Sequence, residues 1–300
     1  MSHAPAVLMA LCAAIGFSSK AIFVKLVYLA PDVSVSAVTL VALRMFLALP
    51  VFLWVAFRGK APAEPLARRD AGMLILLGIV GYYGSSLCDF QGLKHISAAL
   101  ERLILYTYPT LTVLIAVIFF RHRLTRRECA SIALSYAGIG LAFAHDLNAS
   151  GTGDSIWIGA GLVFAASLLY AAYLSGSAPM IARLGSVRFT ALCMTVSCIG
   201  TILHFLATEP FAALALPWRI YTLIFAMALF STILPVFMLS AAIARIGAAR
   251  TVLIGSIGPI VTIFMGWLWL DERLSLPQII GALLVLAGVL LVSLARKKPA

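Results

Sequence analysis

Charged side chains are scarce in this sequence: they make up 11% of its 300 residues, whereas hydrophobic residues make up 63%. Acidic residues are especially few, with 11 Asp and Glu against 22 Lys and Arg, and the mean hydropathy is +1.07. A water-soluble domain of this length would need many more polar side chains to cover its surface. The composition therefore excludes an ordinary soluble protein and indicates that lipid surrounds most of the chain.

The motifs of enzymes and nucleotide-binding proteins are also missing. The chain contains no GxSxG, GxxxxGK[ST] or HExxH pattern, so we predict no catalytic residue and no ATP hydrolysis by this chain. Its five cysteines form no CxxC pair, and no His-rich loop accompanies them. We therefore expect no metal site and no cofactor.

Long apolar segments are what the sequence has in abundance. A hydrocarbon core about 30 Å thick is crossed by about 20 helical residues. By this measure the sequence predicts an all-α integral membrane protein with ten transmembrane helices. They span residues 6–29, 34–57, 71–92, 97–120, 127–145, 155–176, 187–207, 219–243, 247–270 and 277–295.

Lys and Arg residues are concentrated in alternate loops between these segments. Because positive residues stay on the cytoplasmic side, this asymmetry predicts that both termini are cytoplasmic and that the number of spans is even. It also explains the net charge of +11 without a nucleic-acid partner. We expect a multi-pass protein of a bacterial inner membrane. The basic loops contain Arg58, Lys60, Arg68, Arg69, Arg121, Arg123, Arg126, Arg127, Arg183, Arg188, Arg245, Arg250, Arg296, Lys297 and Lys298, and the other loops contain Lys94, Arg219 and Arg273.

The sequence contains an internal repeat. Residues 96–141 align without a gap on residues 246–291, at an offset of 150, and the matched pairs include Pro109 with Pro259. Five spans separate equivalent positions, and since five is odd, the second half must cross the membrane in the opposite direction. We predict an inverted pair of five-helix units, residues 1–146 and 147–300, around a central cavity. Such a pair makes alternating access possible, although a passive pore would also fit.

Proline interrupts three spans near the middle of the bilayer. Pro109 and Pro259 remove the hydrogen bonds to the carbonyl groups of Leu105 and Gly255, which need another partner or contact with water. Ser256 lies close to the second break. A third break is expected in the eighth span, at Pro235, Ser231 and Thr232. These positions are candidate hinges that line a substrate path, and tolerated structural kinks are the alternative.

Ionisable side chains within the apolar segments are costly and often functional. Lys20 and Arg44 lie too deep in their spans to reach the membrane surface easily. We expect them to pair with Asp89 or Glu101, or to face water. Together they would form a slightly positive vestibule that attracts a carboxylate, or a neutral structural ion network.

Five tyrosines also lie deeper than the usual interfacial belt of aromatic residues, and a buried hydroxyl needs a hydrogen-bond partner. They would line a cavity for a flat or apolar organic solute, or they would join helices by hydrogen bonds. The five are Tyr82, Tyr83, Tyr106, Tyr108 and Tyr170. By contrast, Ser131 and Gly138, and their equivalents Gly281 and Gly288, lie two helical turns apart and predict close packing of the fifth and tenth spans, as a scaffold or an oligomer contact.

Several of these features occur together near the C-terminus: Pro259, the DERL sequence at 271–274, Gln278, Gly281 and AGVLL at 287–291. With Arg44 and Ala248-Ala249, they resemble the EamA-type units of the drug/metabolite transporter superfamily. The chain is most similar to YddG-type exporters of aromatic amino acids and related metabolites. The first half departs from the motif, because RHRL at 121–124 replaces the acidic sequence.

The resemblance implies ten helices in an inverted arrangement, with the substrate in a central cavity and the fifth and tenth helices outside it. We therefore expect a secondary transporter that exports small organic solutes, amino acids in particular, and that acts as a monomer or a homodimer in membrane lipid. An exporter of lipophilic cations is one alternative. A membrane scaffold or receptor without transport activity is another.

The two repeated prolines provide a direct test of the hinge hypothesis. Pro109→Ala and Pro259→Ala should each slow transport while the protein still folds, because alanine restores the missing backbone hydrogen bond and stiffens the helix. Solute flux in liposomes and the elution profile in detergent measure the two properties. Full activity in both variants would contradict a hinge at these positions.

Overall fold

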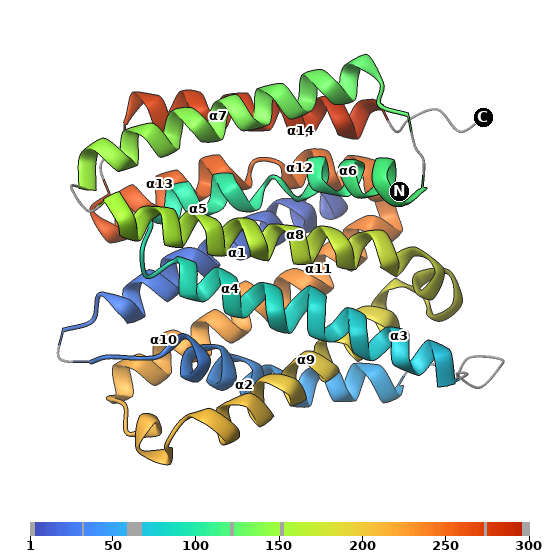
Figure 1. Cartoon of the computed structure of the whole chain (residues 1–300). Helices are drawn as coiled ribbons and strands as arrows, with labels where there is room; N and C mark the ends of the chain where they lie inside the picture. The colour runs from blue at the N-terminus through green and yellow to red at the C-terminus, as the bar shows by residue number, and fades with distance from the viewer. Residues whose placement is uncertain are drawn as a thin grey trace.

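A computed structural model describes residues 4–31, 33–58, 68–120, 123–150, 153–272 and 275–295. The described chain is a bundle of helices without a strand (Figure 1). The basic residues Lys60, Arg121, Arg273, Arg296, Lys297 and Lys298 lie outside these ranges, as does Leu274. The helices are α1 (Ala4–Tyr28), α2 (Ala37–Arg58), α3 (Arg68–Gly78), η1 (Ile79–Gly84), α4 (Ser85–Gly92), α5 (Ala98–Leu105), α6 (Tyr108–Phe120), α7 (Arg126–Ser150), α8 (Gly153–Leu184), α9 (Ser186–Thr208), η2 (Phe211–Leu214), α10 (Trp218–Ala228), η3 (Leu229–Ile233), α11 (Leu234–Ile246), α12 (Ala248–Gly255), α13 (Gly258–Leu270) and α14 (Leu276–Ala295).

The expected all-helical membrane architecture is confirmed. Within the described residues, nine helical stretches are long and apolar enough to cross a membrane, and α14 adds a shorter apolar run at Leu276–Leu291. Large apolar side chains such as Phe57, Phe119 and Trp269 remain exposed on the outside of the bundle. Lipid would cover such a surface, since a soluble protein rarely exposes so much of it. The main difference from the predicted boundaries is α8, which continues through Pro179 to Leu184 instead of ending near residue 176.

The helix boundaries repeat at the same offset of 150 residues as the sequence. Each pair of equivalent segments begins 150 residues apart: α3 with α10, η1 with η3, α5 with α12, and α6 with α13. The repeat thus includes the interruptions as well as the helices. In Figure 1, α5 and α6 run away from the left end of the bundle, whereas α12 and α13 run towards it. The two units therefore cross the bundle in opposite directions, as the odd number of spans predicts.

The two units exchange contacts around their first helices. α1 packs against η3, α11, α12 and α13 of the second unit, and α8 packs against η1, α4, α5 and α6 of the first. The first helix of each unit therefore fills the space between the third and fourth spans of the other. Below, the end of the bundle where α1 begins and α14 ends is called the terminal end, and the opposite end, with the loops at 93–97 and 209–217, is called the distal end.

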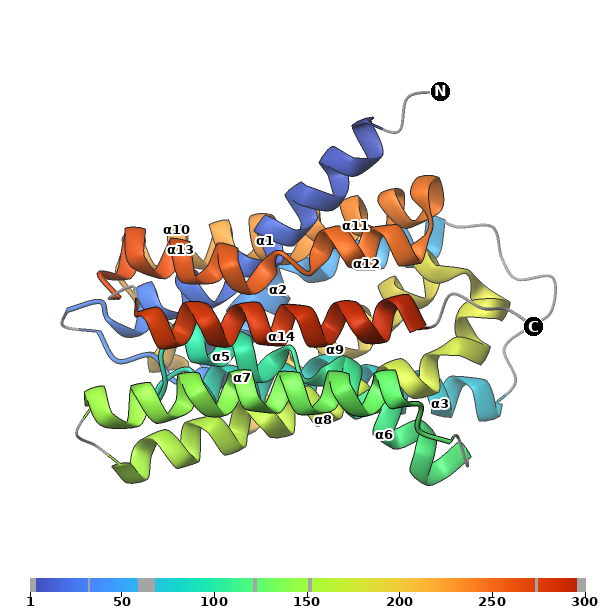
Figure 2. The same cartoon turned by 90° about the horizontal axis from the view of Figure 1, so that it is seen from above.

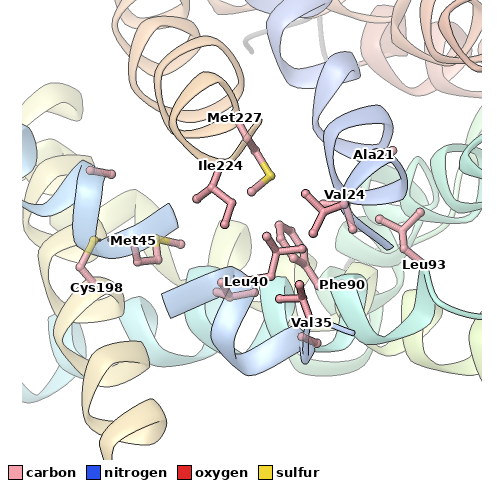
Figure 3. Packing of buried hydrophobic residues seen from close by; sticks show 14 of the residues in the cluster. Ala21, Val24, Val35, Leu40, Met45, Phe90, Leu93, Cys198, Ile224 and Met227 are labelled. Atoms are coloured by element: carbon pink, nitrogen blue, oxygen red, sulfur yellow. Dashed lines mark hydrogen bonds between the residues drawn. The ribbon is translucent and has the colours of Figure 1, made fainter. Parts of the chain in front are cut away.

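A core of buried apolar side chains joins the two units near the distal end. Figure 3 shows Val24 of α1, Leu40 of α2 and Phe90 of α4 converging on Ile224 and Met227 of α10. All five side chains are fully buried. Because lipid is as apolar as this core, close packing rather than exclusion of water favours their association.

α7 and α14 lie side by side at one edge of the bundle, apart from most other helices (Figures 1 and 2). Their contact uses the small residues that the sequence singled out. A methyl group at Gly138 would come within 2.5 Å of the carbonyl oxygen of Gly281, and the reverse also holds. Ser131 Oγ donates a hydrogen bond of 2.6 Å to the carbonyl oxygen of Gly288. The predicted scaffold role is thus realised within one chain, where the two small-residue faces cover each other.

This contact predicts the effect of adding one methyl group. Gly138→Ala should lower the free energy of unfolding by about 1–3 kcal/mol, because the new group forces α7 and α14 apart. Gly140→Ala, on the same helix, is the matched control, since open space surrounds its Cβ position. Thermal unfolding in detergent measures both variants. Equal stability of the two would contradict the packing described.

Candidate functional site

The fourth and ninth spans are each broken at the middle of the bundle. The break falls at residues 106–107 between α5 and α6, and at residues 256–257 between α12 and α13. Pro109 and Pro259 are the second residues of α6 and α13. Proline fits this position because the first turn of a helix has no intrahelical partner for its N–H groups. Each proline thus begins a new helix after the break.

The carbonyl groups released by the two prolines are hydrogen-bonded across the repeat. Ser167 Oγ of α8 donates to the carbonyl oxygen of Leu105 at 3.1 Å. Tyr106 Oη donates to the carbonyl oxygen of Gly255 at 2.8 Å. In each case the hydroxyl group comes from the opposite unit, so the breaks hold the two units together in this conformation. These bonds meet the requirement that buried backbone groups have partners in an apolar environment.

The third and eighth spans contain matched π-helical turns, η1 and η3. Pro235 follows η3 and removes one helical hydrogen bond, which accounts for the wider turn there. The equivalent residue in the first unit is Ser85, whose hydroxyl donates to the carbonyl oxygen of Ala166 at 2.9 Å. No proline lies at the corresponding position after η1, so the search for prolines did not predict this interruption. The 150-residue repeat could have predicted it from the break at Pro235.

The predicted residues near η3 and α12 take part in helix packing. Ser231 Oγ lies 2.8 Å from Ser19 Oγ of α1, and Pro235 fits against Gly16 so closely that a side chain at Gly16 would overlap it. Thr232 Oγ1 donates to the carbonyl oxygen of Met227 at 3.5 Å. Ser256 is buried after α12 and donates to a carbonyl within its own turn. Ser231 and Pro235 therefore pack against α1, whereas Thr232 and Ser256 donate hydrogen bonds within their own helical segments.

Four of the five predicted tyrosines belong to one row of rings that connects the two units. From Tyr106 the row passes to Tyr108 (ring centroids 6.1 Å apart), to Tyr170 (5.2 Å), to Tyr173 (5.7 Å) and to Tyr82 (5.0 Å). Tyr82, Tyr108 and Tyr170 retain part of their accessible surface, although helices of both units surround them. Tyr173 was not among the predicted site residues. Tyr173 follows Tyr170 by three residues and so lies on the same helical face, and this spacing could have identified it.

Tyr83 lies apart from this row. Its hydroxyl is 2.8 Å from Nδ1 of His204 on α9, and the two rings meet edge to face. The structure therefore places Tyr83 at the contact between η1 and α9. Tyr83 thus joins two helices by a hydrogen bond, which was the alternative to lining a cavity.

The deep charges also come together. Lys20 Nζ lies 2.5 Å from Asp89 Oδ2 and 3.3 Å from Glu101 Oε1. We call these three residues the Lys20 cluster. The side chains of Asp89 and Glu101 are 2% and 0% exposed, whereas that of Lys20 is 16% exposed. The predicted pairing of Lys20 is found, with both acids at once.

Two buried arginines flank the Lys20 cluster. Arg44 donates a hydrogen bond of 3.0 Å to Ser86 and lies over the ring of Phe90. Arg102 donates a hydrogen bond of 3.4 Å to Ser18 and lies over the ring of Tyr106, where the tyrosine row begins. The deep cations are thus engaged with polar groups and aromatic faces. The arrangement is the ion network that the sequence left open, rather than a vestibule of free positive charges.

Acidic residues join the units at the distal end, which the sequence did not predict. Asp271 adopts a left-handed conformation (φ 53°) that turns the chain back, and Glu272 Oε1 accepts a hydrogen bond of 2.9 Å from the backbone N–H of Ala98, at the start of α5. Asp146 accepts hydrogen bonds from Ser97 (2.6 Å) and Gln278 (2.7 Å). Burial raises the pKa of Glu272. In this conformation the distal end is therefore fastened by hydrogen bonds between the units.

The bonds at the two breaks predict the effect of removing one hydroxyl group. Ser167→Ala and Tyr106→Phe should each lower the free energy of unfolding by about 1 kcal/mol, because a backbone carbonyl loses its partner in an apolar environment. Ser240→Ala is the control, since that hydroxyl donates only to the carbonyl four residues earlier in its own helix. Unfolding in detergent is the measurement. A loss in Ser240→Ala equal to the other two would contradict a special role for the breaks.

Comparison with known proteins agrees with this architecture. The model of the EamA-like transporter family matches residues 4–144 and again residues 157–294. A solved crystal structure shares the fold over 98% of both chains, with a TM-score of 0.65 at 17% sequence identity.

Curated relatives carry transporter names. The uncharacterized transporter YcbK of Bacillus subtilis is 31% identical over 276 residues, which cover 88% of this chain and 85% of the relative. A probable terminal-alkyne amino-acid exporter of Streptantibioticus cattleyicolor is 25% identical over 231 residues, or 75% of this chain and 74% of that one. From the two family matches and the inverted ten-helix fold, the chain belongs to the EamA-like transporter family of membrane proteins.

Proposed function

We propose that this protein is a secondary transporter of a bacterial inner membrane that exports small organic solutes, amino acids with aromatic side chains in particular. The observation that carries the proposal is the row of tyrosines between the two units, which begins beside Arg102. Aromatic rings suit a flat apolar side chain, and the guanidinium group of Arg102 suits an α-carboxyl group. The amino-acid exporter among the relatives supports the same substrate class.

The proposed transport cycle uses the inverted repeat. Units 1–146 and 147–300 would rock against each other around the breaks near Pro109 and Pro259, and the tyrosine row would face each side of the membrane in turn. The hydrogen bonds at Leu105 and Gly255 would break and re-form during each cycle. The basic loops at the terminal end favour a cytoplasmic location for both termini, so the distal end would face the outside.

An exporter of lipophilic cations is the main competing proposal. Such a protein needs an accessible carboxylate in its binding cavity. In this structure the acids of the Lys20 cluster are buried and already paired with an ammonium group, so they are not available to a lipophilic cation. A scaffold or receptor without transport activity is a further alternative, which a flux measurement distinguishes.

Counterflow in liposomes tests the proposed function. Liposomes that contain the purified protein and unlabelled phenylalanine should accumulate external labelled phenylalanine, because exchange needs no energy source. Tyr170→Ala should reduce this exchange about tenfold, the loss expected when roughly 1.4 kcal/mol of aromatic contact is removed. Tyr83→Ala is the matched control, because Tyr83 lies outside the row.

The competing functions predict different results. Uptake of a lipophilic cation such as tetraphenylphosphonium, without phenylalanine exchange, would replace the proposal with a multidrug exporter. Absence of flux for every solute tried, with the protein folded in the liposomes, would favour a scaffold or receptor. Equal losses in Tyr170→Ala and Tyr83→Ala would contradict the tyrosine row as the substrate path.

A further inference from the structure

The Lys20 cluster has an unusual balance of charge for the interior of a membrane protein. A single ammonium group contacts one oxygen of each of two carboxyl groups, at 2.5 and 3.3 Å. The three side chains come from α1, α4 and α5, all in the first unit. Two carboxyl groups therefore compete for one ammonium group in an apolar interior, where an ionised group without enough hydrogen-bond donors costs several kcal/mol, as an order of magnitude.

The second oxygens of the two acids point to a bound proton. Asp89 Oδ1 and Glu101 Oε2 are buried and have no hydrogen-bond partner among the described residues. Both carboxyl groups contact the same ammonium group, so they lie next to each other. Ionised carboxylates only accept hydrogen bonds, so a hydrogen bond between the two acids requires a proton on one of them. A single proton shared by the two acids would supply the missing donor.

Other charged and titratable groups lie around the cluster on several neighbouring elements. Arg44 and Arg102 are additional cations beside the cluster, and their guanidinium groups also donate hydrogen bonds to Ser86 and Ser18. Lys25 interacts electrostatically with Glu101 and with Asp146 and Glu272, the two acids that fasten the distal end. Among the described residues these groups include Lys25 and Tyr28 of α1, Arg44 of α2, Cys88 of α4, Arg102 of α5, Tyr106 after α5, Asp146 of α7 and Glu272 after α13.

The repeat indicates that this cluster is not needed to fold a five-helix unit. The residues 150 positions after Lys20, Asp89 and Glu101 are Tyr170, Leu239 and Thr251, all uncharged. The second unit has the same helices and the same breaks without these charges. A buried ion cluster in one unit only is therefore best explained by function.

We infer that Asp89 and Glu101 share one exchangeable proton and that proton movement through this site drives solute export; the inference rests on the transport function proposed above. On release, the O–H bond of the shared carboxyl group breaks and the proton passes to water. Two carboxylates then compete for Lys20. Because Lys20 lies on α1, which packs against η3 and α13 of the other unit, this change acts on the contact between the units. Rebinding a proton from the opposite side restores the pair.

Two measurements on the full-length protein in liposomes test the inference. In the first, phenylalanine is loaded into the liposomes and the external solution is made more acidic than the interior. This pH gradient should drive phenylalanine out of wild-type liposomes against its concentration gradient. Glu101→Gln should abolish this driven transport and retain counterflow, since exchange does not need the proton cycle. Asp89→Asn should behave in the same way. Glu128→Gln, an acid that caps α7 through Thr125, is the control and should retain both activities.

The second measurement does not depend on the substrate. Infrared difference spectra during a pH titration should contain the C=O stretching band of one protonated carboxyl group, which disappears on deprotonation and is missing from Glu101→Gln and Asp89→Asn. If phenylalanine is not exchanged at all, the proposed substrate is wrong and the band alone decides on the proton site. Normal counterflow with no effect of a pH gradient would overturn proton coupling, and a wild-type spectrum without a titrating carboxyl band would overturn the shared proton.

Discussion

The structure depends on one constraint: a backbone that crosses lipid must satisfy its polar groups within the protein. Proline at positions 109 and 259 violates the helical solution to this constraint, and hydroxyl groups of Tyr106 and Ser167 repair it from the opposite unit. The same feature therefore weakens each helix and joins the two units. A contact of this kind is strong enough to hold one conformation and, being a pair of single hydrogen bonds, weak enough to be exchanged for another.

The repeat distributes three roles among the helices. α7 and α14 contact each other through small residues and leave the centre of the bundle to the other spans. The first helix of each unit packs into the other unit, so a movement of one unit changes the contacts of the other. The interruptions in the third, fourth, eighth and ninth spans lie where these first helices pack. This arrangement concentrates irregular backbone at the contact between the units, where a transporter has to change shape.

Charge breaks the symmetry that the helices keep. The first unit carries the Lys20 cluster and the arginines beside it, whereas the matching positions of the second unit carry the uncharged residues Tyr170, Leu239 and Thr251. One member of that set, Tyr170, belongs to the tyrosine row. The position that holds an ammonium group in one unit thus holds an aromatic ring in the other. Two five-helix units of the same shape have acquired different chemistry at equivalent places.

The sequence alone determined that lipid surrounds the protein, how many spans it has, that it contains a repeat and where prolines interrupt the spans. These features follow from local composition and from an ungapped alignment of the chain with itself. It also identified Lys20 and most of the tyrosine row as unusually deep. Only the tertiary structure decided which partners they have. Asp89 and Glu101 could have reached the membrane surface, Tyr83 could have joined the row, and Glu272 had no visible partner until α13 was placed beside α5. Helix periodicity fixes the face on which a side chain lies, but not which helix packs against that face, since long-range packing in lipid depends on shape matched over many residues.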